Sequence, residues 1–451
     1  MSIRWCSRYL VAVFALGAVV SAMAPAHASD WPQTGFDSAH TGFNPNEVFL
    51  DPYNVGDLEV QWTNGTPCTI RQGVSVADGM VYYGHYCGDF RAVDAETGAL
   101  RWEQRLDGKD VGQAVVNGVA YVASIGAAYA FDAATGASLW TWDPEPIIEE
   151  APVLANGMAF LYTSDDVLHM LDAASGVEID NVSPGGFPAV SDGIVYVSRD
   201  SLRAYSIGTL ELLWTGTGLL DSLWTGRYPV VADGLVYAQS DDGYMNVYRA
   251  GGCGEEFCPP LWRAFLQVQT QLDHPQIPAV GHGKVFVGAN GDFHAFPADG
   301  CGEFECDPLW TTTTNCDYFG EQPSVANGVV YSVCDTTDIY AFDASNGDIL
   351  WQYYTSTGYA MRSPPVIVDG RLFHDATFDF TLYAFHVPGA GTLGVDTYGL
   401  KRDVWGVCTN FTTGQSVWIF DPGRTSMDCG AAGLDIAEND VVVMIIYGQA
   451  E

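Results

Sequence analysis

The cysteines are the first residues of this sequence whose spacing could carry chemistry. Two C-x4-C pairs, Cys253 with Cys258 and Cys301 with Cys306, lie in near-identical blocks at 252–258 and 300–306. Such a pair could bind zinc or form a disulfide. Both blocks lack the C-x2-C spacing and the partner histidines of zinc ribbons. We therefore predict no metal site here, but a disulfide at the tip of a hairpin in each block.

The other cysteines also favour disulfides. Two pairs flank equivalent glycines of the repeat described below, at similar distances before and after each glycine. An even number of cysteines, ten, follows the first 28 residues, as expected of an exported chain. The further predicted disulfides are Cys68–Cys87, Cys316–Cys334 and, near the C-terminus, Cys408–Cys429.

The first 28 residues have the features of a secretory signal peptide. Arg4 and Arg8 precede a short apolar run over 9–20, and residues 26–28 (Ala-His-Ala) form a small-residue cleavage site. The run is short for a transmembrane helix, although an uncleaved anchor is the alternative. No other stretch could span a bilayer. We expect a secreted or periplasmic protein cleaved near Ala28.

The sequence contains no recognised catalytic motif and no dedicated metal-binding loop. Asp165-Asp166 and Asp241-Asp242-Gly243 could offer carboxylates to Ca²⁺, but neither has the alternating oxygen ligands of a calcium loop. Solvated hairpin turns explain both. The nine histidines are scattered, and no H-E-x-x-H, G-x-S-x-G or P-loop occurs. The sequence therefore predicts no catalytic residue.

The elements that would position any site come from a repeat of roughly 40 residues. Eight segments carry Asp, Asn or His before Gly, followed by an alternating apolar strand. Asn-Gly and Asp-Gly favour the two-residue hairpin turn, in which both residues take positive φ. The eight turns are Asp78-Gly79, Asn117-Gly118, Asn156-Gly157, Asp192-Gly193, Asp233-Gly234, His282-Gly283, Asn327-Gly328 and Asp369-Gly370.

A second motif ends each repeat. Residues 92–102 read A-x-D-x-x-T-G-x-x-x-W, and residues 130–140 and 341–351 follow the same pattern. Asp caps the turn, Gly takes a left-handed conformation, and Trp begins a fourth strand that can pack on the next unit. In the third unit Asp180 stands in place of Trp. The predicted blade-docking residues are Trp62, Trp102, Trp140, Trp214, Trp262, Trp310 and Trp351.

These patterns predict an all-β fold, an eight-bladed β-propeller of four-stranded antiparallel blades. The eighth unit lacks its fourth strand, which residues 58–62 would supply, so that an N-terminal strand closes the ring. We expect an N-terminal extension over 29–57, the propeller over 58–388 and a small disulfide-tied β module over 393–451.

The tryptophan motif resembles that of the pyrroloquinoline-quinone (PQQ) dependent alcohol dehydrogenases. It also resembles repeats in the lipoprotein scaffold of the outer-membrane β-barrel assembly machine, and residues 31–42 resemble the start of other PQQ-repeat propellers. The resemblance, over about residues 30 to 387, implies the fold and makes PQQ or Ca²⁺ a possible cofactor. This chain lacks the adjacent cysteines and the haem motif C-x-x-C-H of the family's enzymes, and the lipidated cysteine of the scaffold.

A propeller often binds its ligand on the axis, where the segments that lead into each blade converge. Aligning the units on the turn glycine places polar residues there. Three arginines among them could grip a carboxylate ligand such as PQQ, or could simply neutralise the neighbouring glutamates. The candidate axial residues are Arg71, Gln72, Asp110, Glu149, Glu150, Arg227, Gln276, Glu321 and Arg362.

The formal charge of −37 disfavours binding to nucleic acid or to anionic membranes. Packing signals without a catalytic set favour a non-catalytic, exported binding or scaffold protein with an unidentified protein or small-molecule ligand on one face. The alternatives are a PQQ- or metal-dependent oxidoreductase and a surface protein that uses its C-terminal module for adhesion.

Overall fold

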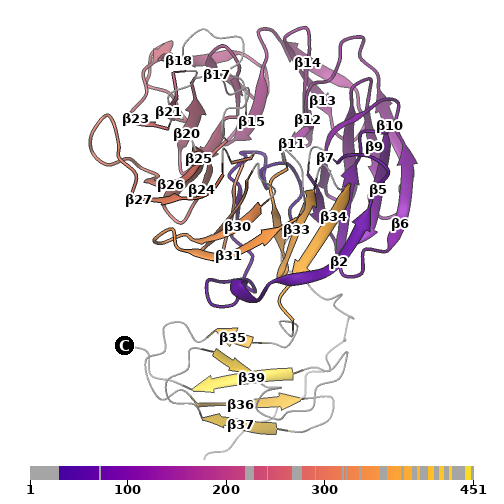
Figure 1. Ribbon diagram of the computed structural model, residues 1–451. Helices are drawn as coiled ribbons and strands as arrows, with labels where there is room; N and C mark the ends of the chain where they lie inside the picture. The colour runs from indigo at the N-terminus through magenta and orange to yellow at the C-terminus, as the bar shows by residue number, and fades with distance from the viewer. Residues whose placement is uncertain are drawn as a thin grey trace, which may run out of the picture.

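The computed structural model describes residues 30–388, apart from 71–72, 219–227, 241, 267–276, 290, 317–318, 321, 335–337, 356–362 and 377–379. It also describes the backbone of five strands between residues 394 and 447. Apart from one short 3-10 helix, the described elements are β-strands. Eight sheets stand around a central axis, so the predicted eight-bladed propeller is confirmed (Figure 1).

Each blade is an antiparallel sheet whose strands run in sequence from the axis outward. Blade 1 contains β3 (Ser75–Ala77), β4 (Met80–Gly84), β5 (Asp89–Asp94) and β6 (Leu100–Arg105). Blade 2 contains β7 (Asp110–Val116), β8 (Val119–Ser124), β9 (Ala128–Asp132) and β10 (Ser138–Trp142). Blade 3 contains β11 (Val153–Ala155), β12 (Met158–Thr163), β13 (Val167–Asp172) and β14 (Glu178–Val182). Blade 4 contains β15 (Phe187–Ser191), β16 (Ile194–Ser198), β17 (Leu202–Ser206) and β18 (Leu212–Gly216).

The second half of the ring repeats this order. Blade 5 contains β19 (Val230–Ala232), β20 (Leu235–Gln239), β21 (Tyr244–Arg249) and β23 (Trp262–Phe265). Blade 6 contains β24 (Ala279–Gly281), β25 (Lys284–Ala289), β26 (Asp292–Pro297) and β27 (Trp310–Thr313). Blade 7 contains β28 (Ser324–Ala326), β29 (Val329–Val333), β30 (Asp338–Asp343) and β31 (Ile349–Tyr354). Blade 8 contains β32 (Val366–Val368), β33 (Arg371–Ala376), β34 (Thr381–His386) and, from the N-terminal side, β2 (Glu59–Gly65).

Strand β2 closes the ring as predicted. It pairs antiparallel with β34 from Glu59, opposite His386, to Gly65, opposite Thr381. The 3-10 helix η1 (Val55–Asp57) leads into it. Because the N-terminal strand completes the last blade, β34 has a partner on its outer side and the ring is closed.

All eight predicted hairpin turns have the predicted backbone. The first residue of each has φ between 42° and 53°, and the following glycine has φ between 69° and 81°. Both residues therefore take the left-handed conformation that a type I′ turn requires. This turn fixes the register of the first two strands of every blade.

The docking tryptophans connect successive blades. Six of them donate their indole N–H to a backbone carbonyl of the neighbouring blade, as Trp102 does to Ala133 at 2.8 Å. The other five such bonds are Trp62 to Ala95, Trp140 to Ala173, Trp214 to Ala250, Trp310 to Ala344 and Trp351 to Leu58. Trp262 is also buried, but among the described residues its N–H has no partner. The Tyr237 hydroxyl donates instead to Ala298, the equivalent carbonyl, at 2.8 Å.

A glycine lies beneath six of the seven rings, all except that of Trp351, and makes this contact possible. A Cβ at residue 136 would lie 2.7 Å from the Trp102 ring, and Gly136 has φ +73°. Where blade 3 carries Asp180 instead of Trp, the matching turn of blade 4 carries Leu210, with φ +48°, instead of Gly. The tryptophan and its glycine are therefore lost together.

The N-terminal extension fills the propeller axis, which the sequence did not predict. Between residues 31 and 44 it hydrogen-bonds to the inner strand of every blade, always at the residue two positions before the hairpin turn. Its backbone accepts from the N–H groups of Val115, Val190, Val231, Val280 and Val325, and exchanges two bonds with Val76. The Gln33 side chain accepts from Leu154 N–H, and the Asn44 side chain donates to Ile367 C=O.

Strand β1 (Phe43–Asn44) ends this axial segment and pairs parallel with β28. In Figure 1 the indigo start of the chain lies at the centre of the ring. One continuous segment therefore satisfies inner backbone groups of all eight blades, which would otherwise lack partners at the axis.

Four of the five predicted disulfides are present. Cys68–Cys87, Cys253–Cys258, Cys301–Cys306 and Cys316–Cys334 have Cα–Cα distances of 5.6–5.8 Å. Cys408 lies in β36, but Cys429, its predicted partner, lies outside the described residues.

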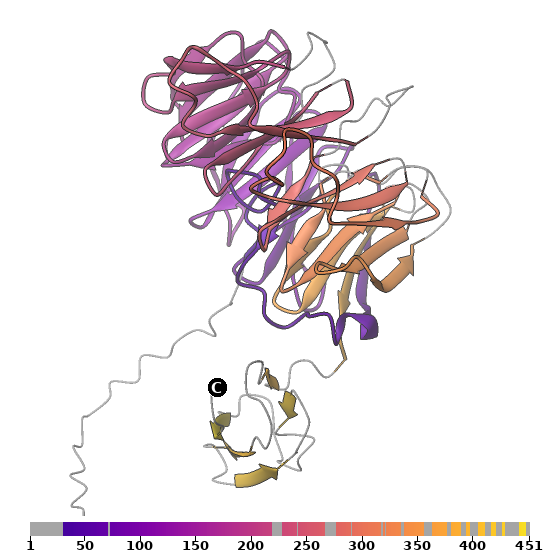
Figure 2. The ribbon, with the colours of Figure 1, turned by 90° about the vertical axis from the view of Figure 1, so that its left-hand side faces the viewer.

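The C-terminal segment contains strands where the sequence predicted them. In a three-stranded antiparallel sheet, β36 (Trp405–Asn410) lies between β37 (Ser416–Phe420) and β39 (Val442–Tyr447). The strands β35 (Gly394–Asp396) and β38 (Ser426–Asp428) form a second pair. Figure 2 shows these strands in yellow.

A pair of alanine substitutions tests the glycine requirement. Gly136→Ala should lower the free energy of unfolding by about 1–3 kcal/mol, because the new methyl group meets the Trp102 ring and the backbone is left-handed. Gly208→Ala is the matched control, since a Cβ there meets nothing within 4 Å. Urea unfolding of both variants measures the difference. Equal losses would contradict the docking argument.

A pH titration tests the buried histidines, one of which lies in the axial segment. Burial lowers the pKa of His40 to about 4 and that of His374 to about 3. Both stay neutral in the fold but take up a proton on unfolding below the usual pKa of 6.5. The unfolding free energy should therefore fall as pH falls, by about 1.4 kcal/mol per histidine between pH 7.5 and 5.5.

The variant His40→Gln separates the two contributions. It should remove about 1.4 kcal/mol of the loss between pH 7.5 and 5.5, measured by urea unfolding at each pH, and leave the contribution of His374 in place. An unchanged dependence would show that His40 does not contribute to it.

Candidate functional site

The structure describes few of the predicted axial residues. Arg71, Gln72, Arg227, Gln276, Glu321 and Arg362 lie outside the described residues, and only the backbone of Asp110, at the start of β7, is described. Glu149 is exposed, and its N–H donates to Tyr162 C=O at 3.0 Å. Glu150 is half-buried and accepts a long 3.5 Å hydrogen bond from the Tyr228 hydroxyl. Whether the nine residues converge therefore stays a prediction.

Several buried polar side chains around the axis were not predicted. Gln322 donates to the carbonyls of His40 at 2.6 Å and Pro278 at 2.8 Å, which ties the axial segment to blade 6. The His40 ring lies between the carbonyls of Thr34 and Pro188, at 2.8 and 3.0 Å, and 4.2 Å from the ring of Tyr228. The sequence shows these glutamines and this histidine next to apolar residues, which could have marked them as buried polar groups. It does not show that they lie close together at the axis.

Two buried polar side chains around the axis have an atom that forms no hydrogen bond with any described residue. Gln113 donates through Nε2 to Gly73 C=O at 3.2 Å, while its Oε1 has no partner. The Ser363 hydroxyl, in blade 8, also has no hydrogen-bond partner among the described residues. Ser363 lies close to Gly73, because a Cβ placed on Gly73 would be 3.6 Å from the Ser363 Cβ. Both side chains are at least 97% buried. Unpaired buried polar atoms are unfavourable, so a polar ligand here could stabilise them.

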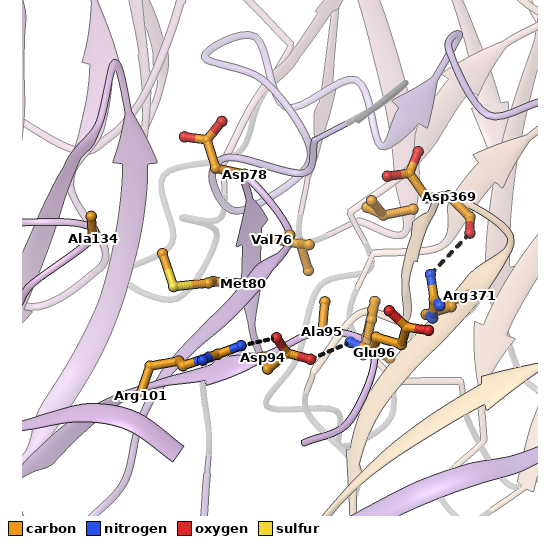
Figure 3. A pocket seen from close by; sticks show the side chains of 13 residues that line it. Val76, Asp78, Met80, Asp94, Ala95, Glu96, Arg101, Ala134, Asp369 and Arg371 are labelled. Atoms are coloured by element: carbon orange, nitrogen blue, oxygen red, sulfur yellow. Dashed lines mark hydrogen bonds and ion pairs between the residues drawn. The ribbon is translucent and has the colours of Figure 1, made fainter. Parts of the chain in front are cut away.

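A separate pocket of 490 Å³ lies on the hairpin side of the ring, between blades 8 and 1 (Figure 3). The hairpins 76–80 and 368–373, the turn 94–96 and parts of β6 and blade 2 line it. The apolar part of its wall includes Val76, Met80, Val368 and Phe373. Its volume is in the range of small-molecule sites.

Four carboxylates and two guanidinium groups give this pocket a negative balance. Figure 3 shows Asp78 and Asp369 on one side, and Arg101, Asp94, Glu96 and Arg371 in a row on the other. Arg101 Nη2 lies 2.5 Å from Asp94 Oδ2. Burial raises the pKa of Asp94, but hydrogen bonds from Arg101 and Thr97 outweigh it and leave this pKa below its usual value. The pocket's charge suits a cationic group better than an anion such as PQQ.

Within the described part of the chain, no group of three or more His, Cys, Asp or Glu side chains could hold a metal ion. Among the same residues, no helix is long and apolar enough to cross a membrane.

Comparison with solved structures supports the fold. The quinohemoprotein alcohol dehydrogenase of Comamonas testosteroni superposes with a TM-score of 0.64 at 15% identity, covering 84% of each chain. BamB from Moraxella catarrhalis gives 0.58 at 16% identity, covering 73% of this chain and 99% of that one. A europium-containing methanol dehydrogenase gives 0.63 at 12% identity, covering 80% and 98%. At such identities the likeness shows the fold alone.

No curated protein sequence matches the chain. A family model of PQQ-type repeats, described as outer membrane protein assembly factor BamB, matches residues 53–140, 88–179 and 259–387. These matches include more than half of the sequence, and the eight blades have the corresponding architecture. The chain therefore belongs to the family of PQQ-repeat β-propellers.

Proposed function

We propose that this chain is a non-catalytic, exported binding or scaffold protein that engages a protein partner. Exposed apolar side chains also occur on the outer strands of other blades, such as Leu100 and Ile349. The observation that carries the proposal is the set on the outer strands and loops of blades 4, 5 and 6, which includes phenylalanines. These side chains are between 40% and 59% exposed. They are Leu212, Leu213, Phe257, Leu261, Phe265, Phe304 and Leu309.

Exposed aromatic and aliphatic side chains of this kind are typical of protein interaction surfaces. Three of the seven are phenylalanines, which exported proteins rarely expose without a use. The formal charge of −37 opposes close contact between two copies of the chain. A different protein, not a second copy, is therefore the expected partner.

The second candidate function is a PQQ- or metal-dependent oxidoreductase. Two of the similar structures are named as dehydrogenases, and Gln113 Oε1 and Ser363 Oγ have no hydrogen-bond partner within the described part of the chain. The described residues do not by themselves make up a site for the quinone and a calcium ion, because their axial carboxylates, Glu149 and Glu150, come from one blade. The role of a surface adhesin, with the C-terminal module as its contact, is the third candidate.

Reconstitution with PQQ and Ca²⁺ separates the first two candidates. Titration calorimetry of the purified mature protein should give no saturable heat, and a dye-linked alcohol-oxidation assay should give no turnover. The Ser363→Ala variant is measured beside it, because loss of any observed binding in this variant would place PQQ at the axis. Tight binding with turnover in the unaltered protein would overturn the scaffold proposal.

A further inference from the structure

The duplicated cysteine blocks are larger than the fold requires. In blades 1, 2, 3 and 7 a five-residue turn, such as 94–98, joins the third strand to the fourth. Blades 5 and 6 insert the blocks 252–258 and 300–306 at this place. Gly252 and Gly300 keep the docking role, since a Cβ on either would lie 2.7–2.8 Å from Trp214 or Trp262. The remaining residues of each block are not needed for that contact.

Each block lies, as the sequence predicted, in the loop of a hairpin and is closed by a disulfide, but it makes further contacts that the sequence did not predict. Each lies against the outer strand of the preceding blade and extends its sheet. Strand β22 (Phe257–Cys258) pairs parallel with β18 of blade 4, where Thr215 N–H donates to Glu256 C=O at 2.8 Å. In the same way, Arg263 of blade 5 donates to Phe304 C=O and accepts from Cys306 N–H. We call these two segments the clasp loops.

The clasp loop of blade 6 completes a row of side chains in contact with one another on the outer edge of blade 5. The Arg263 guanidinium lies 4.0 Å from the centre of the Tyr244 ring and 5.2 Å from that of Phe304. The Tyr244 and Phe265 rings are 5.0 Å apart. Glu305 forms an ion pair with Arg263 and holds it in place. Phe265 and Phe304 remain 49% and 51% exposed.

Protection of a sheet edge does not explain these exposed rings. A loop that only covers an edge against aggregation would present charged or proline residues to solvent. The clasp loops present glutamates, but they also expose Phe257 and Phe304, and a disulfide fixes the backbone beside each ring. Rigid aromatic side chains lose little entropy on binding, which suits them to anchor a partner.

Charge indicates the chemistry of that partner. Glu255 and Glu256 directly precede Phe257, and Glu303 directly precedes Phe304. The carboxylates of these three glutamates are exposed and form no hydrogen bond or ion pair with any described residue. A partner surface that carries apolar side chains beside Lys or Arg would complement them.

We propose that the two clasp loops and the Tyr244–Arg263–Phe265–Phe304 row form the docking surface for a basic, apolar segment of another protein. This inference rests on the proposed scaffold function and assigns its contact to the outer edges of blades 4 and 5. Two similar loops on neighbouring blades would allow two contacts with the same partner, which strengthens binding through the linkage between them.

Site-specific photocrosslinking in the source organism tests the proposal. A photoreactive phenylalanine analogue replaces Phe257, Phe304, Leu139 or Ile147, one at a time, in the full chain. Leu139 is the matched control on the outer strand of blade 2, and Ile147, between blades 2 and 3, reports on a site away from the clasp loops; both are 52% exposed. We expect one protein to crosslink at Phe257 and Phe304 but not at Leu139.

Binding of that partner, once purified, is then measured by calorimetry. The double variant Phe257→Ser/Phe304→Ser should weaken binding at least tenfold, whereas Leu139→Ser should leave it unchanged. Glu255→Gln/Glu256→Gln/Glu303→Gln should also weaken it and reduce its dependence on salt, unlike the control Glu145→Gln at an exposed position outside the clasp loops. Circular dichroism confirms that each variant is folded.

The outcomes distinguish this inference from the proposed function. A partner that crosslinks only at Ile147 would overturn the docking surface and leave the scaffold function standing. Crosslinking at none of the four positions would also overturn the docking surface. The scaffold function itself is overturned by the separate result of PQQ binding with turnover.

Discussion

The contact between a docking tryptophan and the turn of the next blade is the interaction on which the rest of this structure depends. A buried indole N–H needs an acceptor, and the turn offers a carbonyl oxygen outside the sheet ladder, as Ala133 does for Trp102. The ring also needs space, which a glycine provides. Where Asp180 replaces the tryptophan, Leu210 replaces the matching glycine, so both halves of the contact are absent between blades 3 and 4. Elsewhere in the ring, one or two residues per repeat dock successive blades and leave the rest of each blade free to vary.

The axis imposes a second constraint. Eight inner strands face one another with backbone groups that no neighbouring strand can pair. Residues 31–44 supply partners to all eight, which connects blades that are far apart in the sequence. The chain thus uses its own N-terminal segment as the first occupant of the axis. A ligand on the axis must fit beside this segment, near groups such as Gln113 Oε1 and Ser363 Oγ that the segment leaves unpaired.

Local signals explain which features the sequence could predict. The hairpin turns, the docking motif and the missing fourth strand of the eighth unit are each written in a few consecutive residues, and they gave the blades, their number and the closure by β2. The axial position of residues 31–44 depends on contacts with eight distant strands, and no periodicity within the segment reveals them. The pocket between blades 8 and 1 likewise combines Asp78 with Asp369, which meet only because the ring closes. The predicted convergence of nine residues on the axis stays a prediction, because the structure describes the side chains of only Glu149 and Glu150 among them.

The clasp loops show how function can be added to such a repeat. Gly252 and Gly300 retain the packing role of the short turns, so the insertions do not disturb inter-blade docking. The added residues pair with the backbone N–H and C=O groups on the outer edge of the fourth strand, which the blade itself leaves unpaired, and a disulfide constrains each loop. Edge pairing fixes the backbone of each loop, and this fixed backbone determines where Phe257 and Phe304 are displayed. A surface built in this way is rigid before any partner arrives, so binding need not order a flexible loop. That difference separates the clasp loops from an ordinary long surface loop and makes them the strongest candidate for contact with another protein.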